Sequence, residues 1–250
     1  MRIENSFLPV RGIGEQTERR LWREGITHWD VFDESAVGEA QGRRIREFID
    51  QGREALAAGD SGYFYDVFPS GSRWRLYENF RPRTCFFDIE TTGLSAHSSE
   101  VTTVSFHRGG ETTTLVRGED LTRAAVASEL RAADLLVSFN GKRFDVPFLE
   151  QSFDLDIERP HLDLMYACRQ LDLTGGLKAI EREVGIDRDR ADLSGRDAVR
   201  LWRAHERGDP DALGTLVSYN RDDTRNLETL LEIVTDRLHD DVFVAACDGR

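Results

Sequence analysis

The sequence predicts an α/β protein in which a mixed β-sheet is flanked by helices and a small helical module comes first. Three observations support this prediction. Glycine turns and helical patterns fill the N-terminal region, a β-type apolar run begins at CFFDIETTGL, and strand and helix patterns alternate from there onward. At 250 residues the chain buries enough surface on folding that neither a disulfide nor a structural metal is required.

The N-terminal region begins with a glycine turn, Gly12-Ile13-Gly14, followed by a predicted helix over Glu15–Arg23. Gly25 suits the left-handed position that ends such a helix. Thr27 is expected to cap a second short helix that contains Trp29. This order resembles a helix-hairpin-helix element, and the resemblance implies that Gly12, Ile13 and Gly14 present backbone amides to a phosphate. A hairpin that only packs is the alternative.

A longer helix, expected over Ala36–Ala58, completes a helical module that spans residues 1–58. Residues 59–82 begin with a stretch rich in glycine, serine and aromatic side chains, and they are predicted to form a connection. The second predicted domain spans residues 83–250.

In this second domain, strand patterns alternate with helical patterns in an order that favours a layered α/β fold. Strands are expected at Cys85–Ile89, Val101–His107, Thr112–Val116 and Leu135–Phe139. Helices are expected at Asp120–Ala133, Val146–Gln151, Leu177–Val184, Arg196–Arg207 and Leu213–Leu238.

The charge composition is strongly acidic. Acidic residues number 46 against 33 basic ones, for a formal net charge of −13, and only Lys142 and Lys178 are lysines. At ~1 M salt the Debye length is ~3 Å, so such an excess of carboxylates causes little repulsion, and we interpret the surface as halophilic. This charge does not exclude a nucleic-acid partner, but it removes the usual argument for one from a basic patch.

A membrane or secreted protein is not expected from this sequence. No apolar run approaches the ~20 residues of a membrane span, and MRIENSFLPVRG lacks the apolar core of a signal peptide. The three cysteines, Cys85, Cys168 and Cys247, lie far apart without a CxxC pair, which favours a reducing compartment. The expected location is the cytoplasm.

The first chemical motif is Asp88-Ile89-Glu90, which follows an apolar run that marks a buried strand. Alternate residues of a strand share a face, so Asp88 and Glu90 project to the same side. Two adjacent carboxylates repel each other unless cations lie between them, and their hard oxygen atoms suit a divalent metal. Alone, however, the DxE pattern is common.

Two further acidic motifs follow along the chain. Asp145 ends the motif SFNGKRFD, just beyond a predicted buried strand, where it can reach a metal site on a neighbouring strand. Tyr219 and Asp223 lie four residues apart in the last predicted helix and therefore share a face. Taken singly, Asp145 and Asp223 are better explained as helix caps or exposed charges.

Together, the three motifs resemble those of the DEDD 3′–5′ exonucleases of the RNase H-like superfamily. These enzymes carry DxE on the first strand, NxxxFD after a later strand and YxxxD on the last helix. The resemblance covers roughly Thr84 to Leu238 and implies an RNase H-like fold. FFDIETTGL and the N-terminal module are most similar to YprB-type domains, and Tyr219 indicates the tyrosine subclass.

The resemblance also implies a two-metal mechanism at the 3′ end of DNA or RNA. Asp88, Glu90, Asp145 and Asp223 would bind two divalent ions ~3.5–4 Å apart, one activating a water and the other stabilising the leaving 3′ oxygen. Mg²⁺ or Mn²⁺ is expected, because carboxylate ligands suit these ions. Tyr219 would orient the attacking water, since a phenol with a pKa of ~10 is a poor base at neutral pH.

Residues beside these motifs are expected to contact the terminal nucleotide, although the first three also fit a simple turn. They are Thr91, Thr92, Gly93, Leu94, Asn140 and Lys142. Asn140 also fits a role in holding the end of its strand, and the contact expected of Lys142 is to a phosphate. Asp163, which follows another apolar segment, is expected either to support the site or to cap a helix.

Two other functions stay open: a catalytically inactive nucleic-acid-binding adaptor and an RNase H-like endonuclease. The complete set of carboxylates argues against the adaptor, and Tyr219 favours an exonuclease over an endonuclease. The sequence indicates no particular protein partner.

Overall fold

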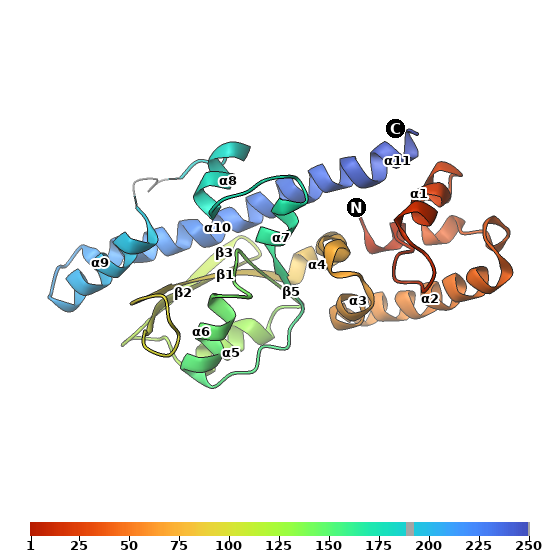
Figure 1. The fold of residues 1–250 in the computed structure, drawn as a ribbon. Coiled ribbons are helices and arrows are strands. Elements are labelled where there is room, and N and C mark those ends of the chain that lie inside the picture. Colours follow the sequence, from red (N-terminus) through yellow and green to blue (C-terminus); the bar gives the residue numbers. More distant parts are fainter. Residues whose placement is uncertain (189–192, 250) are drawn as a thin grey trace. The chain divides into compact units, whose positions relative to one another are not determined.

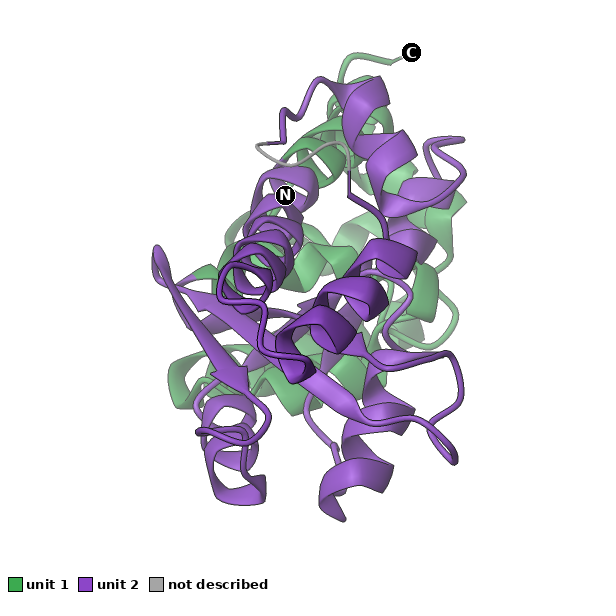
Figure 2. Cartoon of the chain, turned by 90° about the vertical axis from the view of Figure 1, so that its left-hand side faces the viewer, with its two compact units in different colours: residues 1–81, 233–250 green, residues 82–232 purple. Residues whose placement is uncertain are grey.

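The computed structural model describes residues 1–188 and 193–249, which form the elements labelled in Figure 1. The chain divides into two compact units, drawn in green and purple in Figure 2. Unit 1 comprises residues 1–81 and 233–250, and unit 2 comprises residues 82–232. The C-terminal residues therefore group with the N-terminal helices, whereas the sequence assigned all of residues 83–250 to one domain.

Unit 1 is helical throughout. Its α-helices are α1 (Glu15–Arg23), α2 (Glu39–Ala58), α3 (Ser61–Val67), α4 (Tyr77–Phe80) and α11 (Ala245–Cys247). It also has 3-10 turns at Ile3–Asn5, Trp29–Val31, Glu34–Ala36 and Ser70–Leu76, and a π-helical turn at Asp240–Val244. A further 3-10 turn, Arg81–Arg83, begins at the last residue of the segment 1–81 and continues into unit 2. Residues 61–80, which fall in the predicted connection, are therefore largely helical.

The start of unit 1 departs from the predicted hairpin at its second helix. Helix α1 has the predicted bounds, and Gly25 adopts the expected left-handed backbone with φ 88°. The second helix is only a 3-10 turn, and its cap is His28, whose ring nitrogen accepts a hydrogen bond from the Asp30 N–H, so the prediction of Thr27 as the cap is wrong. Helix α2 begins three residues later than predicted, after Gly38.

Unit 2 is built on a five-stranded mixed sheet, which confirms the predicted fold class. Its strands are β1 (Thr84–Thr91), β2 (Val101–Arg108), β3 (Glu111–Val116), β4 (Leu135–Ser138) and β5 (His161–Asp163), in the spatial order β3-β2-β1-β4-β5. Strands β3, β2 and β1 pair antiparallel, and β1, β4 and β5 pair parallel. The four predicted strands are all present.

Helices flank this sheet. They are α5 (Arg123–Arg131), α6 (Asp145–Phe153), α7 (Leu164–Arg169), α8 (Leu177–Val184), α9 (Gly195–Glu206) and α10 (Ala212–His239), whose last residues belong to unit 1. Helix α5 begins later than predicted because Thr122 caps it by accepting a hydrogen bond from the Ala125 N–H. None of the described helices is both long and apolar enough to span a membrane.

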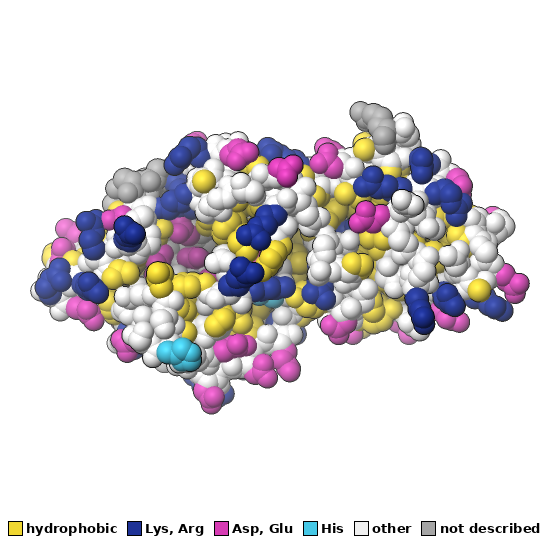
Figure 3. All heavy atoms as spheres, in the orientation of Figure 1, with side chains coloured by type: hydrophobic (Ala, Val, Ile, Leu, Met, Phe, Trp, Pro, Cys, Tyr) yellow, Lys and Arg dark blue, Asp and Glu magenta, His cyan; other side chains and the backbone are white. Residues whose placement is uncertain are grey.

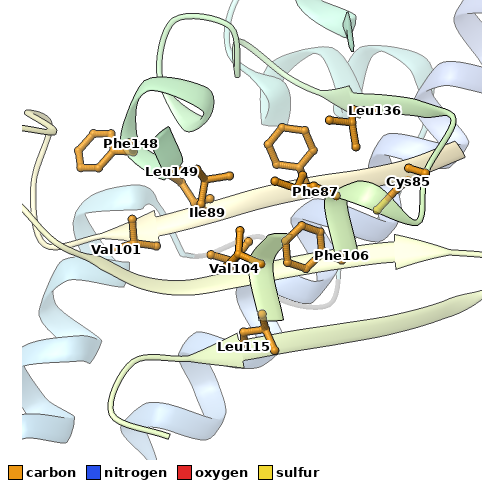
Figure 4. Packing of buried hydrophobic residues seen from close by; sticks show 13 residues of the cluster. Cys85, Phe87, Ile89, Val101, Val104, Phe106, Leu115, Leu136, Phe148 and Leu149 are labelled. Atoms are coloured by element: carbon orange, nitrogen blue, oxygen red, sulfur yellow. The ribbon is translucent and has the colours of Figure 1, made fainter. Parts of the chain in front are cut away.

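The main core of unit 2 lies on one face of the sheet. Phe87 and Ile89 of β1 pack there with Val104 and Phe106 of β2, against residues of α5 and α6 (Figure 4). Because successive residues of a strand face opposite sides, Asp88 and Glu90 project from the other face. Helix α10 covers that second face, where its side chains hydrogen-bond to β1 and β2.

Candidate metal centre

Three of the predicted carboxylates converge on the α10 side of the sheet. One carboxylate oxygen of each of Asp88, Glu90 and Asp223 lies within 4.8 Å of the other two. Glu90 and Asp223 are buried, and Asp88 is partly buried. Oxygen atoms gathered from β1 and α10 at this spacing form a set of hard ligands suited to Mg²⁺ or Mn²⁺.

Asp145 joins this group from the segment that follows β4, the strand that pairs parallel with β1. It is the first residue of α6, is buried, and accepts a hydrogen bond from the backbone N–H of Ile89, which lies between the two acidic residues of β1. That N–H is available because the pairing of β1 with β4 ends at Phe86. The structure therefore brings all four predicted carboxylates to one place, although Asp145 is not in the tightest group of three.

The four carboxyl groups have raised pKa values in the absence of cations. For Asp88 and Glu90 the largest cause is burial, followed by repulsion from the other carboxylates. Burial also raises the pKa of Asp145 to about 7 and that of Asp223 above its usual range. Divalent cations would offset this repulsion, so the residues present fit a metal centre.

This protonation predicts how the stability of the metal-free protein depends on pH. Folded Asp145 holds its proton up to about pH 7, whereas the ordinary value is 3.8, so between these values the folded state binds more protons than the unfolded chain. The contribution to stability is present below about pH 4 and is lost as the pH rises through about 7. We therefore expect the melting temperature in EDTA to fall across this interval more steeply than that of Asp145→Asn, measured by circular dichroism. Parallel curves for the two proteins would contradict this.

Tyr219 lies one helical turn before Asp223, and its buried hydroxyl hydrogen-bonds to the Asp223 carboxylate. Burial, followed by repulsion from Asp223 and the carboxylates of β1, raises its pKa far above 10. The Nζ atom of Lys178 lies 4.5 Å from the centre of its ring. A phenol in this setting keeps its proton and therefore acts as a hydrogen-bond donor rather than as a base.

Asp163 both caps a helix and supports the loop before Asp145. Its carboxylate accepts a hydrogen bond from the Met165 N–H at the start of α7, and it also accepts from the N–H groups of Asn140 and Lys142 at 2.7 and 3.2 Å. The backbone of Asn140 is left-handed, with φ 61°, a conformation that asparagine adopts more often than most residues do. The expectation of a helix cap is therefore confirmed, and a role for Asp163 in supporting the site stays a prediction.

Asn220 is a residue of the site that the sequence analysis did not select, although it stands next to Tyr219. It is fully buried on α10, and its Nδ2 atom donates to Asp88 Oδ2 at 2.7 Å. Its Oδ1 atom accepts from the hydroxyl groups of Thr103 and Ser105, which lie opposite Glu90 and Asp88 on β2. Two donors at Oδ1 set the orientation of the amide, which leaves Asp88 one oxygen for a metal.

This contact leads to a prediction for Asn220→Leu. The change keeps the side-chain volume but removes the donor to Asp88, and loss of such a supporting group typically weakens metal binding by about 10–100-fold. Titration with Mn²⁺, followed by electron paramagnetic resonance, measures the effect. The control Thr114→Val removes a hydroxyl group that contacts Ser105 but not Asn220, and it should bind Mn²⁺ like the unmodified protein. Equal Mn²⁺ affinity in both variants would contradict the role of Asn220.

Two further residues next to the carboxylates, Arg188 and Glu181, were not predicted from local sequence patterns. The guanidinium of Arg188 pairs with both Asp223 and Glu181, and its side chain is only 5% exposed. The pKa of Glu181 is raised, because the effect of burial exceeds the opposing effect of its hydrogen bond to Arg188. In a chain so rich in arginine, no sequence signal separates Arg188 from the others.

A cavity of about 700 Å³ opens beside Glu90, and several of the residues predicted to bind substrate line its wall. It is lined by Ile89, Glu90, Thr91, Gly93, Leu94, Phe144, Ser194, Gly195, Arg196 and Val199. Leu94 is 90% exposed. Thr92, Asn140 and Lys142 are not among the described residues that line it.

The glycine turn of unit 1 is formed as predicted, but its amides are partly used within the protein. Gly12 has φ 90°, and Gly14 precedes the first turn of α1. The Ile13 N–H donates to the carbonyl of Val10, and Gln41 donates to the carbonyl of Gly12. Phosphate binding by this turn stays a prediction.

A family model and two solved structures are similar to part of this chain. Residues 85–235 match the family model RNase_H_2 of the RNase_H superfamily. The family B DNA polymerase of the archaeon Pyrobaculum calidifontis has a similar fold, with a TM-score of 0.52 and 18% identity over 65% of this chain and 26% of the polymerase. Brucella melitensis NrnC with bound Mg²⁺ aligns with a TM-score of 0.45 and 18% identity, over 69% of this chain and 82% of NrnC. No curated protein sequence matches.

Proposed function

The chain belongs to the RNase H superfamily, and on that premise we propose that it is a two-metal 3′–5′ exonuclease of the tyrosine DEDD subclass, with a YprB-type domain. The observation that carries the proposal is the convergence of Asp88, Glu90 and Asp223 within 4.8 Å, next to a cavity large enough for a nucleotide. Asp145 and Tyr219 complete the set.

The residues of the site have three kinds of task in this proposal: binding the metal ions, orienting the attacking water and holding the carboxylates in place. Asp88, Glu90, Asp145 and Asp223 would hold two Mg²⁺ or Mn²⁺ ions, and these ions would supply an activated water and charge stabilisation for the leaving 3′ oxygen. Tyr219 keeps its proton, which it donates to Asp223, so its oxygen would orient the attacking water by accepting a hydrogen bond from it. Asn220 and Arg188 hold Asp88 and Asp223 in place.

The cavity is proposed to receive the 3′-terminal nucleotide. Leu94 and Phe144 offer apolar surface to a base, while Thr91 and Gly93 line the cavity next to Glu90. At Gly93 a side chain would meet Ser99, since an added Cβ would lie 2.6 Å from its Oγ atom. Glycine at this position therefore lets the backbone turn close to Ser99 while remaining on the cavity wall.

Product sizing tests the proposed function. Single-stranded and duplex DNA and RNA, each labelled at the 5′ or at the 3′ end, are incubated with Mg²⁺ or Mn²⁺, and EDTA serves as the control. We expect mononucleotides to be released first from the 3′ end. Internal fragments would instead indicate an endonuclease, and binding without metal-dependent release would indicate an inactive adaptor.

A further inference from the structure

Helix α9 carries a row of exposed arginines that the proposed mechanism does not use. They are Arg196, Arg200, Arg203 and Arg207, the last at the C-cap of the helix, and we call them the arginine stripe. Their spacing of four, three and four residues places them on one narrow face of the helix. Figure 3 shows dark-blue side chains gathered over α9.

The opposite face of α9 is anchored to the candidate metal centre. Ala198 and Trp202 are buried and pack in one cluster with Leu216 and Tyr219 of α10. The same helix also lies against β1. The arginine stripe therefore faces solvent from a helix whose position is tied to the turn that carries Tyr219.

The arginine stripe begins at the cavity. Arg196 lines the cavity together with Glu90 and Thr91, while the rest of the stripe extends along the helix. At 1.5 Å per residue, the eleven steps from Arg196 to Arg207 cover ~16 Å. One strand of a B-form duplex places a phosphate every ~3.4 Å along its axis, so this length spans several phosphates.

The charges on the stripe are less neutralised than those of three arginines on α2. On α2, for comparison, Arg43, Arg46 and Arg53 pair with Glu39, Glu34 and Asp30. On α9, Arg200 pairs with Asp197, but within the described part of the chain the other three have no carboxylate within 4.0 Å. In a chain with a net charge of −13, this is a local site for an anion.

We propose that the arginine stripe binds the phosphate backbone of the nucleic-acid strand whose 3′ end occupies the cavity. The inference rests on the proposed function, because the metal centre defines which end of the strand is held. Guanidinium groups match phosphate geometry and stay charged at every working pH. Contacts to phosphates position a strand without reading its sequence, so the stripe binds DNA and RNA by shared chemistry.

Strand binding in EDTA tests the arginine stripe without hydrolysis. The triple variant Arg200→Gln/Arg203→Gln/Arg207→Gln is compared with Arg43→Gln/Arg46→Gln/Arg53→Gln on α2, which changes the net charge equally. The probe is a fluorescent single strand of about 12 nucleotides, followed by anisotropy between ~50 and ~500 mM KCl. We expect the α9 variant to bind at least about tenfold more weakly and to lose about 2 units of log–log salt slope, at ~0.7 per phosphate contact.

A second measurement separates this inference from the proposed function. In Mg²⁺ or Mn²⁺, the α9 variant should lose much of the preference for the long strand over a dinucleotide, expressed as a ratio of kcat/KM. If both triple variants remain folded and bind with the same affinity and salt slope, the arginine stripe is not a strand-binding surface, even if the unmodified protein hydrolyses DNA or RNA. If the unmodified protein hydrolyses nothing, the proposed function fails, and the anisotropy result still decides the role of the stripe.

Discussion

Asp88→Asn is expected to abolish metal-dependent hydrolysis, with a loss of at least about 10³-fold. Asp88 stands at the centre of the carboxylate group, since Asp145, Asp223 and Glu90 all contribute to its raised pKa. The amide keeps the shape of the side chain but removes the charge that two divalent ions require. Release of mononucleotides from labelled single strands measures the loss.

The same substitution should leave the fold intact. Burial and repulsion oppose the ionised form of Asp88, so its removal should keep the melting temperature of the metal-free protein level or raise it. Mn²⁺ binding should weaken in parallel with activity. The matched control is Asp156→Asn, which removes an exposed aspartate of unit 2 and should change neither property. Activity above a few per cent in folded Asp88→Asn would overturn the assignment of Asp88 as a metal ligand.

Tyr219→Phe is expected to slow turnover by about 10–10³-fold while Mn²⁺ affinity stays nearly constant. The substitution removes one hydroxyl group, which hydrogen-bonds to Asp223, but it retains the ring, which belongs to the same core cluster as Trp202 and lies 4.5 Å from the Nζ atom of Lys178. Single-turnover rates and a separate Mn²⁺ titration distinguish the two effects.

Tyr166→Phe is the control for this variant, because Tyr166 is an exposed tyrosine of unit 2. It should retain the rate of the unmodified protein. An unchanged rate in Tyr219→Phe would mean that another group orients the attacking water. A large loss of Mn²⁺ affinity would mean instead that the hydroxyl group acts by holding Asp223.

Many elements of unit 2 could be predicted because their signals are local. The alternation of apolar residues along β1 and β2 identifies strands, and it also places Asp88 and Glu90 on the face opposite Phe87 and Ile89. Helix α8 matches its predicted bounds, since the helical repeat and Gly185 mark it within a few residues. The second helix of the N-terminal hairpin was less predictable, because the 3-10 turn Trp29–Val31 has too few residues to show a helical repeat of apolar side chains.

The partners of the site residues could not be predicted in this way. Asn220 and Asp88 are 132 residues apart, and their contact depends on how α10 lies across the sheet. Arg188 reaches Asp223 over 35 residues from a loop with no pattern of its own. Such contacts are set by packing between elements, which the local period of a sequence does not encode.

By itself, the sequence determined the mixed sheet with its flanking helices. Through resemblance to a known family, it also predicted that the four carboxylates and Tyr219 act as one set. The tertiary structure alone decided that Asn220 holds Asp88 and that Arg196 lies at the cavity beside Glu90. It also grouped residues 233–250 with the N-terminal helices. The physical reason is that backbone periodicity is a property of neighbouring residues, whereas burial, charge pairing and cavities arise only when distant segments pack together.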